Sequence, residues 1–305
     1  MPNSGFTVGL VQMACGDDPT ENLAAAVDGI RRAGERGAQI VCLPELFRAR
    51  YFCQTEDASC FDLAEAIPGP TTETLAALAA ELSLVLVVPL FERRAAGVYH
   101  NTVAVIDADG QLLGRYRKTH IPDDPLYYEK FYFTPGDLGY PVFETRHARI
   151  APLICWDQWF PEAARLSALG GAELIVYPSA IGWHPSERDT EGEIQRDSWR
   201  TMHRAHAIAN GIFVAAINRV GHEGPAGGGL TFWGSSFVAG PDGGVLDTGA
   251  ADAPDLVVTR CEREAIERQR RGWPFLRDRR IDTYQDLTRR LADGSSAREP
   301  ARDGS

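Results

Sequence analysis

Short apolar runs alternate with amphipathic stretches along most of the chain, a pattern typical of strands followed by helices. FTVGLVQMA at residues 6–14 is rich in strand-forming residues, and after Asp17, Asp18 and Pro19 the apolar positions repeat with helical spacing to residue 38. QIVCL at 39–43 then predicts a short buried strand. The same succession of helix and strand recurs at residues 71–92, where a predicted helix precedes the strand LVLVVPLFE.

The second half of the chain continues this alternation and adds two hairpins. Residues 99–118 predict a hairpin that turns at Asp109–Gly110, because Asp-Gly favours tight turns. A glycine-rich stretch at 221–230 lacks the lysine of a phosphate-binding loop and is interpreted as a turn. Further strands are expected at 149–155, 173–180, 212–220 and 255–260, helices at 160–172, 193–210 and 262–272, and the second hairpin at 235–249.

This order of elements predicts an α/β fold in which helices cover mixed sheets. The 305 residues are enough for one large domain or two small ones. We expect a single domain over residues 1–290, because no linker or break in composition divides it. Apolar content collapses in residues 291–305, which we expect to form a disordered tail.

Charge and composition narrow the range of functions. The formal net charge is −11, which disfavours nucleic acid as a partner because phosphate binding depends on Lys and Arg. No apolar run is long enough to span a membrane, and no secretory segment precedes the first strand. The six cysteines show neither CxxC nor zinc-like spacing, so we expect free thiols and a cytoplasmic protein.

Cys155 is the candidate nucleophile, because it stands where the apolar strand RIAPLIC meets a helix that Asp157 or Pro161 could open. Helix N–H groups at such a junction stabilise a thiolate and lower the cysteine pKa. A strand-to-helix elbow also exposes its side chain at the edge of the sheet, where ligands of α/β folds bind. A buried structural cysteine is the alternative, although WDQWFPE is a poor core sequence.

Three charged residues are further candidates. Glu45 follows QIVCLP, where partial burial would raise its pKa and make it a usable general base. Lys118 ends the first hairpin and could hold its charge over a developing oxyanion. Glu129 lies in YYEKFYF, whose aromatic rings would perturb its pKa or fix its orientation. Taken singly, each has an ordinary alternative: a helix cap, a surface lysine and an exposed glutamate.

Histidines offer a different base for a cysteine nucleophile. His203 and His206 lie three residues apart on a predicted helix, and His120 follows the first hairpin. Residues with this helical spacing more often pack or form hydrogen bonds than catalyse, and nothing in the sequence pairs them with Cys155. We therefore expect none of the three to be the base.

The order of three separated motifs is more specific than any one residue. LPELF, GRYRKTHIP and ICWDQWFPE resemble the Glu–Lys–Cys signature of the nitrilase, or carbon–nitrogen hydrolase, superfamily. YFCQ, EKFYF, WDQWFPEAAR and YPSAIGW are similar to its N-carbamoylputrescine amidase branch. The resemblance implies a four-layer α-β-β-α sandwich with mixed sheets, no metal or organic cofactor, and a homodimer or larger homo-oligomer. It assigns catalysis to Glu45, Lys118 and Cys155, with support from Glu129.

The resemblance also implies a reaction: hydrolysis of an N-carbamoyl amine to an amine, ammonia and carbon dioxide through a covalent cysteine intermediate. Cys155 would attack the carbonyl carbon and Glu45 would move the proton. Lys118 and the backbone N–H of Trp156 would stabilise the oxyanion. The expected small-molecule substrate is N-carbamoylputrescine, in polyamine biosynthesis.

The far end of that substrate is an ammonium, which needs carboxylates or aromatic faces. A carbamoyl amino acid such as carbamoyl-β-alanine would instead need a cation, for which Arg188 and Arg204 are candidates. Asp124 and Leu126 replace the small residues expected in the branch, which leaves the exact amine open. The activity of an aliphatic amidase or a nitrilase, and a non-catalytic regulatory role on the same fold, stay open as well. The candidate tail-binding residues are Tyr51, Asp124, Asp157, Trp183 and Glu187, and Ser179 is a further candidate for binding the substrate.

Overall fold

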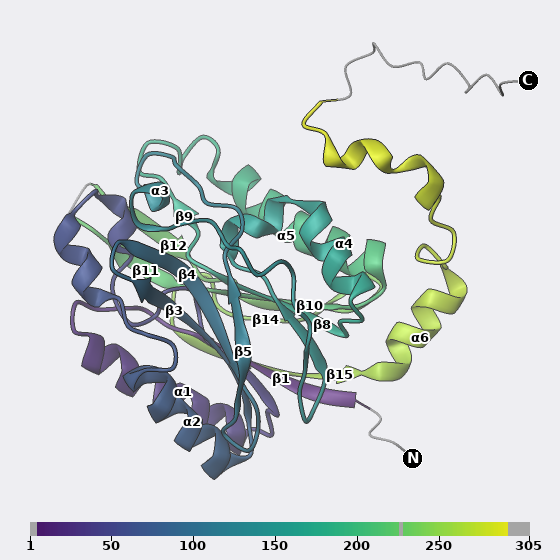
Figure 1. Ribbon diagram of the computed structural model, residues 1–305, viewed down its shortest axis with the longest axis horizontal. Helices are drawn as coiled ribbons and strands as arrows, with labels where there is room; N and C mark the ends of the chain where they lie inside the picture. The colour runs from purple at the N-terminus through teal and green to yellow at the C-terminus, as the bar shows by residue number, and fades with distance from the viewer. Residues whose placement is uncertain (1–4, 226–227, 292–305) are drawn as a thin grey trace, which may run out of the picture.

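Two six-stranded mixed sheets pack face to face at the centre of the protein, and helices cover both outer faces (Figure 1). The computed structural model describes residues 5–225 and 228–291. Buried apolar side chains from both sheets meet in one continuous core, which includes Val8, Val105, Ile175 and Val214. The expected α-β-β-α sandwich is therefore confirmed.

The first sheet has the order β15, β1, β2, β3, β4, β5, in which β1, β2 and β3 are parallel. Helices α1 (Pro19–Glu35) and α2 (Pro70–Leu82) connect these parallel strands and cover their outer face. Asp18 begins α1 by accepting a hydrogen bond from the Thr20 N–H at 2.7 Å, as the sequence predicted. The strands are β1 (Gly5–Gln12), β2 (Ile40–Cys42), β3 (Val85–Ala95), β4 (Val98–Ile106), β5 (Leu112–Arg117) and β15 (Asp255–Glu262).

The second sheet has the order β14, β13, β10, β8, β7, β6. Helices α4 (Pro161–Leu169) and α5 (Gly192–Asn210) lie on its outer face (Figure 1). Both predicted hairpins are confirmed, since β4 pairs with β5 and β13 pairs with β14, each antiparallel. The strands are β6 (Phe143–Glu144), β7 (Arg149–Pro152), β8 (Leu174–Ser179), β10 (Phe213–Asn218), β13 (Phe237–Ala239) and β14 (Val245–Thr248).

A third, three-stranded sheet was not expected. It consists of β11 (Val220–Glu223), β12 (Leu230–Trp233) and β9 (Gly182–Trp183). The glycine-rich stretch at 221–230 was interpreted as a turn, but both of its ends lie in antiparallel strands. The glycines removed the apolar alternation that marks a strand, so pairing with distant residues decides this structure.

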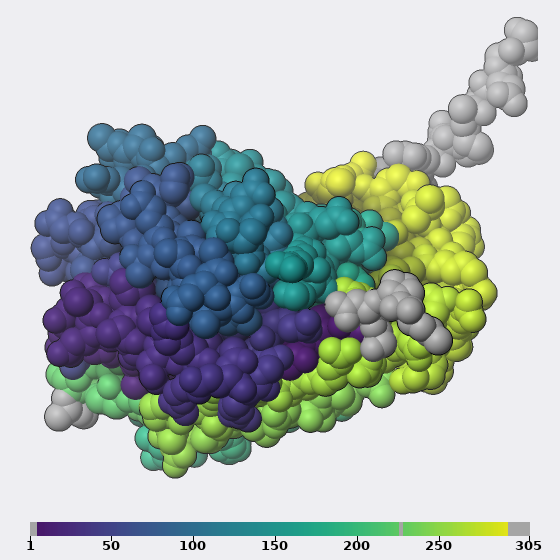
Figure 2. All heavy atoms as spheres, turned by 90° about the horizontal axis from the view of Figure 1, so that it is seen from below, coloured from purple at the N-terminus to yellow at the C-terminus, as the bar shows by residue number. Residues whose placement is uncertain are grey.

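The chain leaves the sandwich through α6 (Arg263–Gly272), and the residues after it lie at one end of the molecule (Figure 2). Beyond Leu291, the expected tail at 291–305 falls outside the described residues. No helix within 5–225 or 228–291 is long and apolar enough to cross a bilayer. The short helices are α3 (Glu129–Tyr132) and the 3₁₀-helices Phe52–Gln54, Ala58–Leu63, Cys155–Trp159, Ile281–Thr283 and Gln285–Thr288.

Candidate active site

Cys155 stands at a sharp turn where the second sheet gives way to a short helix. It follows β7 closely and begins the 3₁₀-helix Cys155–Trp159 with a φ of +40°. A non-glycine residue in this left-handed region strains the backbone, and such strain persists only where the surroundings hold it. The predicted strand-to-helix elbow is thus present at the end of β7.

Asp157 holds this turn from inside the protein. Its Oδ2 accepts hydrogen bonds from the Ile154 N–H at 2.9 Å and from the Tyr116 hydroxyl at 2.7 Å. Its Oδ1 accepts the His120 N–H at 3.0 Å and lies 2.7 Å from the Nδ1 of the same residue. Asp157 was a candidate for binding the substrate tail, but its buried carboxylate is engaged on both oxygens. It joins the cysteine turn to the end of β5 instead.

Lys118 lies between two carboxylates. Its Nζ is 2.8 Å from Oε1 of Glu45 and 2.6 Å from Oε2 of Glu129, and all three side chains are buried. Asn101 on β4 donates its Nδ2 to the same Glu45 oxygen at 2.7 Å. Two acids and a lysine that the sequence selected are therefore gathered from the loop after β2, the end of β5 and the short helix α3.

The mutual contacts of this group set its charge states. Burial disfavours the Lys118 ammonium, but the Glu129 and Glu45 carboxylates outweigh burial and raise the lysine pKa well above its ordinary value. Burial raises the pKa of Glu129 to about 7, and the charge of Lys118 opposes that rise. The site thus keeps a fixed positive charge on Lys118, beside a carboxyl group that titrates near neutral pH.

Cys155 carries its proton at rest. Burial first, and then the nearby Glu45, raise the pKa of its thiol well above the ordinary value, while Lys118 offsets part of the rise. The expected lowering by helix N–H groups is wrong, because the sulfur lies in desolvated surroundings next to a carboxylate. A protonated sulfur is a weak nucleophile, so its attack on a carbonyl requires a base.

Glu45 has the free oxygen that such a base needs. Its Oε2 is buried and has no hydrogen-bond partner within the described parts of the chain, whereas its Oε1 accepts from Lys118 and Asn101. Buried polar atoms are seldom left unpaired, and an exception calls for a functional explanation. Since Glu45 also raises the Cys155 pKa, the two groups interact, and this oxygen can take the thiol proton.

A cavity of about 790 Å³ is lined by Cys155 and Glu129. Its volume falls in the range of small-molecule sites. Two of the predicted tail-binding residues, Asp124 and Glu187, also line it, and the Nε2 of Gln195 donates to Glu187 Oε2 at 2.7 Å. Aromatic walls come from Tyr127, Trp156, Trp159 and Trp233.

The structure places the other substrate-binding candidates away from the cavity wall. The Tyr51 hydroxyl donates to Oε1 of Glu129 at 2.6 Å, so this ring lies behind the cavity. Ser179 donates to a nearby backbone carbonyl at 3.2 Å, and Trp183 donates to the carbonyl at the start of α5 at 3.0 Å. Arg188 stacks on the Trp183 ring at 4.9 Å, and Arg204 donates to the Gly243 carbonyl at 2.8 Å.

The histidines of α5 pack within the protein, as expected. The Nδ1 of His203 lies 2.8 Å from the Trp199 carbonyl, and burial lowers its pKa to about 3. The Nε2 of His206 lies 2.8 Å from the Gln158 carbonyl oxygen. Both rings therefore support the helix and the cysteine turn, and neither lines the cavity.

Three polar residues beside the catalytic group escaped the sequence reasoning: Asn101, Arg219 and Glu223. Arg219 follows the fully buried strand β10, and Glu223 lies four residues later. Charged side chains are rarely buried unless they are paired, so a charged pair directly after an apolar strand is the signal that would have found them. Asn101 gives no such signal, because it lies within a strand of mixed composition.

Comparisons with known proteins agree with this geometry. A model of the carbon–nitrogen hydrolase family matches residues 7–271. N-carbamoylputrescine amidase of Solanum lycopersicum is 44% identical over 96% of this chain and 98% of its own length. Citrullinase of Francisella tularensis is 39% identical over 94% of this chain and 99% of its own length. The crystal structure of a carbon–nitrogen hydrolase from Helicobacter pylori G27 superposes with a TM-score of 0.90 at 43% identity, covering 94% and 99% of the two chains.

The chain belongs to the carbon–nitrogen hydrolase family, as its motifs predicted. It is therefore a hydrolase that acts on carbon–nitrogen bonds other than peptide bonds.

Proposed function

We propose that this protein hydrolyses the carbamoyl group of an amine with a cationic tail, and that N-carbamoylputrescine is its substrate. One observation carries the choice of substrate: the cavity that contains Cys155 presents two further carboxylates, Asp124 and Glu187, and aromatic faces. The similarity to the tomato N-carbamoylputrescine amidase supports the same choice.

The first half of the reaction forms a covalent intermediate. Glu45 accepts the Cys155 proton as the sulfur attacks the carbamoyl carbon, and the carbonyl oxygen becomes an oxyanion. Lys118 and the N–H of Trp156 stabilise that oxyanion, each donor contributing about 3 kcal/mol. One C–N bond then breaks, and the leaving nitrogen takes the proton from Glu45.

The second half releases the products. Glu45 removes a proton from water, whose oxygen attacks the thioester carbon, and the C–S bond breaks as the sulfur regains its proton. The carbamic acid that is left loses carbon dioxide, which breaks its C–N bond. One carbamoyl amine and one water thus give the free amine, ammonia and carbon dioxide. Glu129 holds Lys118 in place throughout and is a positioning residue.

The competing substrates carry a carboxylate. Citrulline, whose tail carries an ammonium as well as a carboxylate, and carbamoyl-β-alanine would each need a cation in the cavity for the carboxylate. Citrullinase is the activity named for the Francisella relative. Among the described lining residues there is no Lys or Arg, and His184 is the one side chain that can become positive. Two carboxylates attract an ammonium and repel a carboxylate, so the cavity favours the diamine derivative, whose tail carries an ammonium alone.

The test is ammonia release from N-carbamoylputrescine, citrulline and carbamoyl-β-alanine at equal concentration. We expect kcat/KM for N-carbamoylputrescine to exceed that for either acid by at least about tenfold, which corresponds to roughly 1.4 kcal/mol. Faster turnover of either acid would overturn the choice of substrate. Turnover of simple amides or nitriles alone would assign the protein to another branch.

The proposal includes a cytoplasmic homo-oligomer. All six cysteines are unpaired, which suits a reducing compartment. Large apolar side chains are exposed on α4 and on the segment after α6, and burial between copies would remove them from water. Light scattering after gel filtration should give at least twice the mass of 33.4 kDa. These side chains are Leu166, Leu169, Trp273, Ile281 and Leu287.

A further inference from the structure

Arg219 forms hydrogen bonds to the loop that carries Glu45. Its guanidinium is fully buried and donates to three backbone carbonyls of that loop. The Nε–H donates to the backbone carbonyl oxygen of Glu45 at 3.0 Å. One terminal nitrogen donates to the backbone carbonyl oxygens of Leu46 at 2.5 Å and Ala49 at 2.7 Å. Charge-assisted hydrogen bonds of this kind fix both position and orientation. The loop therefore has a rigid fastening directly at the catalytic glutamate.

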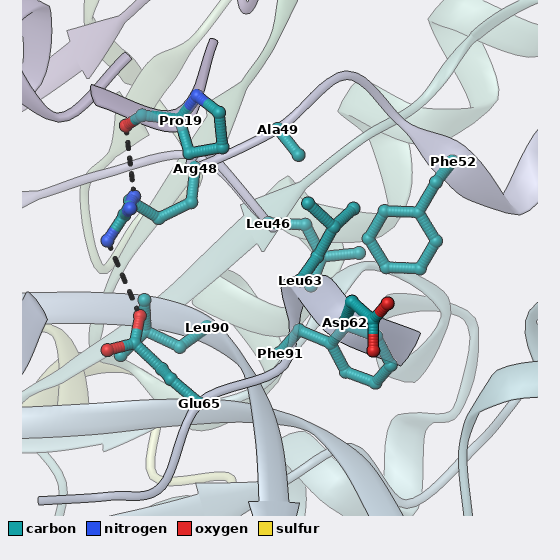
Figure 3. A pocket seen from close by; sticks show the side chains of 10 residues that line it. All are labelled: Pro19, Leu46, Arg48, Ala49, Phe52, Asp62, Leu63, Glu65, Leu90 and Phe91. Atoms are coloured by element: carbon teal, nitrogen blue, oxygen red, sulfur yellow. Dashed lines mark hydrogen bonds and ion pairs between the residues drawn. The ribbon is translucent and has the colours of Figure 1, made fainter. Parts of the chain in front are cut away.

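The opposite face of this loop borders a small cavity. A cavity of about 150 Å³ lies against it, with Leu46 among its lining residues (Figure 3). The outer hydrogen bonds are made at Arg48: its guanidinium donates to the Pro19 oxygen at 3.1 Å and to Thr71, and pairs with Glu65 at 3.5 Å. The Arg48 carbonyl also accepts from the side chain of Asn22 at 3.0 Å. Side chains beside a void lose the contacts that would otherwise restrain them. The outer bonds thus hold the loop at Arg48, whereas the hydrogen bond to the Glu45 carbonyl comes from Arg219 on the inner side.

Glu223 extends the same fastening toward the second carboxylate. Both of its carboxylate oxygens accept from one terminal nitrogen of Arg219, at 2.8 and 3.1 Å, and its Oε2 also accepts the Tyr51 N–H at 2.5 Å. The Tyr51 hydroxyl then donates to Glu129 at 2.6 Å. An unbroken series of contacts thus runs from one buried ion pair to both carboxylates that flank Lys118.

We propose that Arg219 and Glu223 are positioning residues that set the separation of the two carboxylates around Lys118, and with it the aim of Glu45 at Cys155. The inference rests on the proposed function in assigning Glu45 as the base. Arg219 reaches the reaction through the backbone of the Glu45 loop, and Glu223 reaches it through Tyr51.

A purely stabilising ion pair is the competing explanation. A buried pair adds little net stability compared with apolar residues of the same size, so stability alone gives weak grounds for keeping one. The acceptors also argue for positioning, because three of them are backbone carbonyls of the loop that carries Glu45. Lysine keeps the charge but lacks the planar fork, so Arg219→Lys separates the two explanations.

The experiment compares Arg219→Lys with a matched control, Arg263→Lys. Arg263 also holds a carboxylate, Glu173 at 2.8 Å, and a backbone carbonyl, that of His147, but at the start of α6 and away from the cavity. Displacing a catalytic group by about 1 Å can lower a rate by about 100-fold. We expect Arg219→Lys to lower kcat about 100-fold with KM changed less than about threefold, and the control to leave both unchanged.

A second readout needs no substrate. Because Cys155 is protonated at rest, its alkylation by iodoacetamide at neutral pH depends on Glu45, so Arg219→Lys should slow this labelling and Arg263→Lys should not. If wild-type protein fails to turn over N-carbamoylputrescine, the proposed substrate is wrong, and labelling still decides the role of Arg219. Folded Arg219→Lys with wild-type kcat and labelling would overturn the inference.

Two milder variants cover the case in which Arg219→Lys fails to fold. Glu223→Gln keeps the shape and can still accept from the Tyr51 N–H, and Tyr51→Phe removes only the bond to Glu129. We expect each to lower kcat about tenfold, in keeping with one misaligned contact. Wild-type kcat in both folded variants would also overturn the inference.

Discussion

The inner end of the active site and the wall of its cavity are held in different ways. Glu45, Lys118 and Glu129 are buried, bonded to one another and supplied by three distant segments. On the wall, Glu187 is exposed and is held by Gln195, its neighbour on one short stretch of chain. The comparison teaches that the chemistry depends on several long-range contacts that must form together. Substrate preference depends on side chains held by local contacts, and each of these can be substituted without disturbing the others.

Removing the nucleophile should have the largest effect. Cys155→Ala deletes the atom that bonds to the substrate, so we expect turnover to fall by about 10⁴-fold or more. The circular dichroism spectrum and melting temperature should stay close to wild type, because a small side chain is trimmed. Ammonia release measures the loss, and residual turnover near the wild-type rate would remove Cys155 from the mechanism.

Glu45→Gln comes next, with an expected loss of about 10³-fold, within the range for general base catalysis. Because burial raises the Cys155 pKa, the variant has no group to take the thiol proton. Its iodoacetamide labelling should therefore be slow at neutral pH and keep rising as the solution is made alkaline. Wild-type protein should label readily near neutral pH, and equal labelling of the two proteins would contradict the assignment.

Glu129→Gln should lower kcat about 10- to 100-fold, because Lys118 then loses one of its two anionic partners. The pKa of Glu129 is about 7, and its charged form is the one that holds Lys118. Wild-type kcat/KM should accordingly rise as pH increases through about 7 and fall as the carboxyl is protonated below it. That acidic limb should disappear in the variant, and a limb of unchanged position there would assign it to another group.

The cavity wall should give the smallest effects. Glu187→Gln removes one exposed charge, so we expect KM for N-carbamoylputrescine to rise about fivefold with kcat unchanged, since an exposed ion pair contributes about 1 kcal/mol. Added salt should narrow the difference from wild type. Glu191→Gln is the matched control, because Glu191 lies in the same segment and does not line the cavity. Equal effects of both variants would point to overall charge instead of a tail site.

The sequence predicted the parts of this molecule that depend on local order. Alternating apolar and amphipathic segments indicated the sandwich, and three motifs in sequence selected Glu45, Lys118 and Cys155. The contact between Arg219 and Glu45 joins residues 174 positions apart, and no local pattern encodes it. The pKa of Cys155 was misjudged for the same reason, since burial by distant segments outweighs the turn in which the residue lies.

Two substrate candidates show where residue type stops being informative. Asp124 and Asp157 are both aspartates within a few residues of a catalytic residue, yet one lines the cavity and the other is enclosed by backbone and side-chain donors. Only the path of the chain separates them. Sequence can therefore nominate a charged residue for a site, but the neighbouring donors decide whether its charge is available to a ligand.

The proton on Cys155 also bears on chemical durability. Peroxides attack thiolates far faster than thiols, so a sulfur that stays protonated resists conversion to sulfenic acid. An enzyme whose sulfur loses its proton only when Glu45 accepts it should react with peroxide more slowly than an enzyme whose cysteine rests as a thiolate. The same need for a base that limits the nucleophile would then also slow its loss to oxidants.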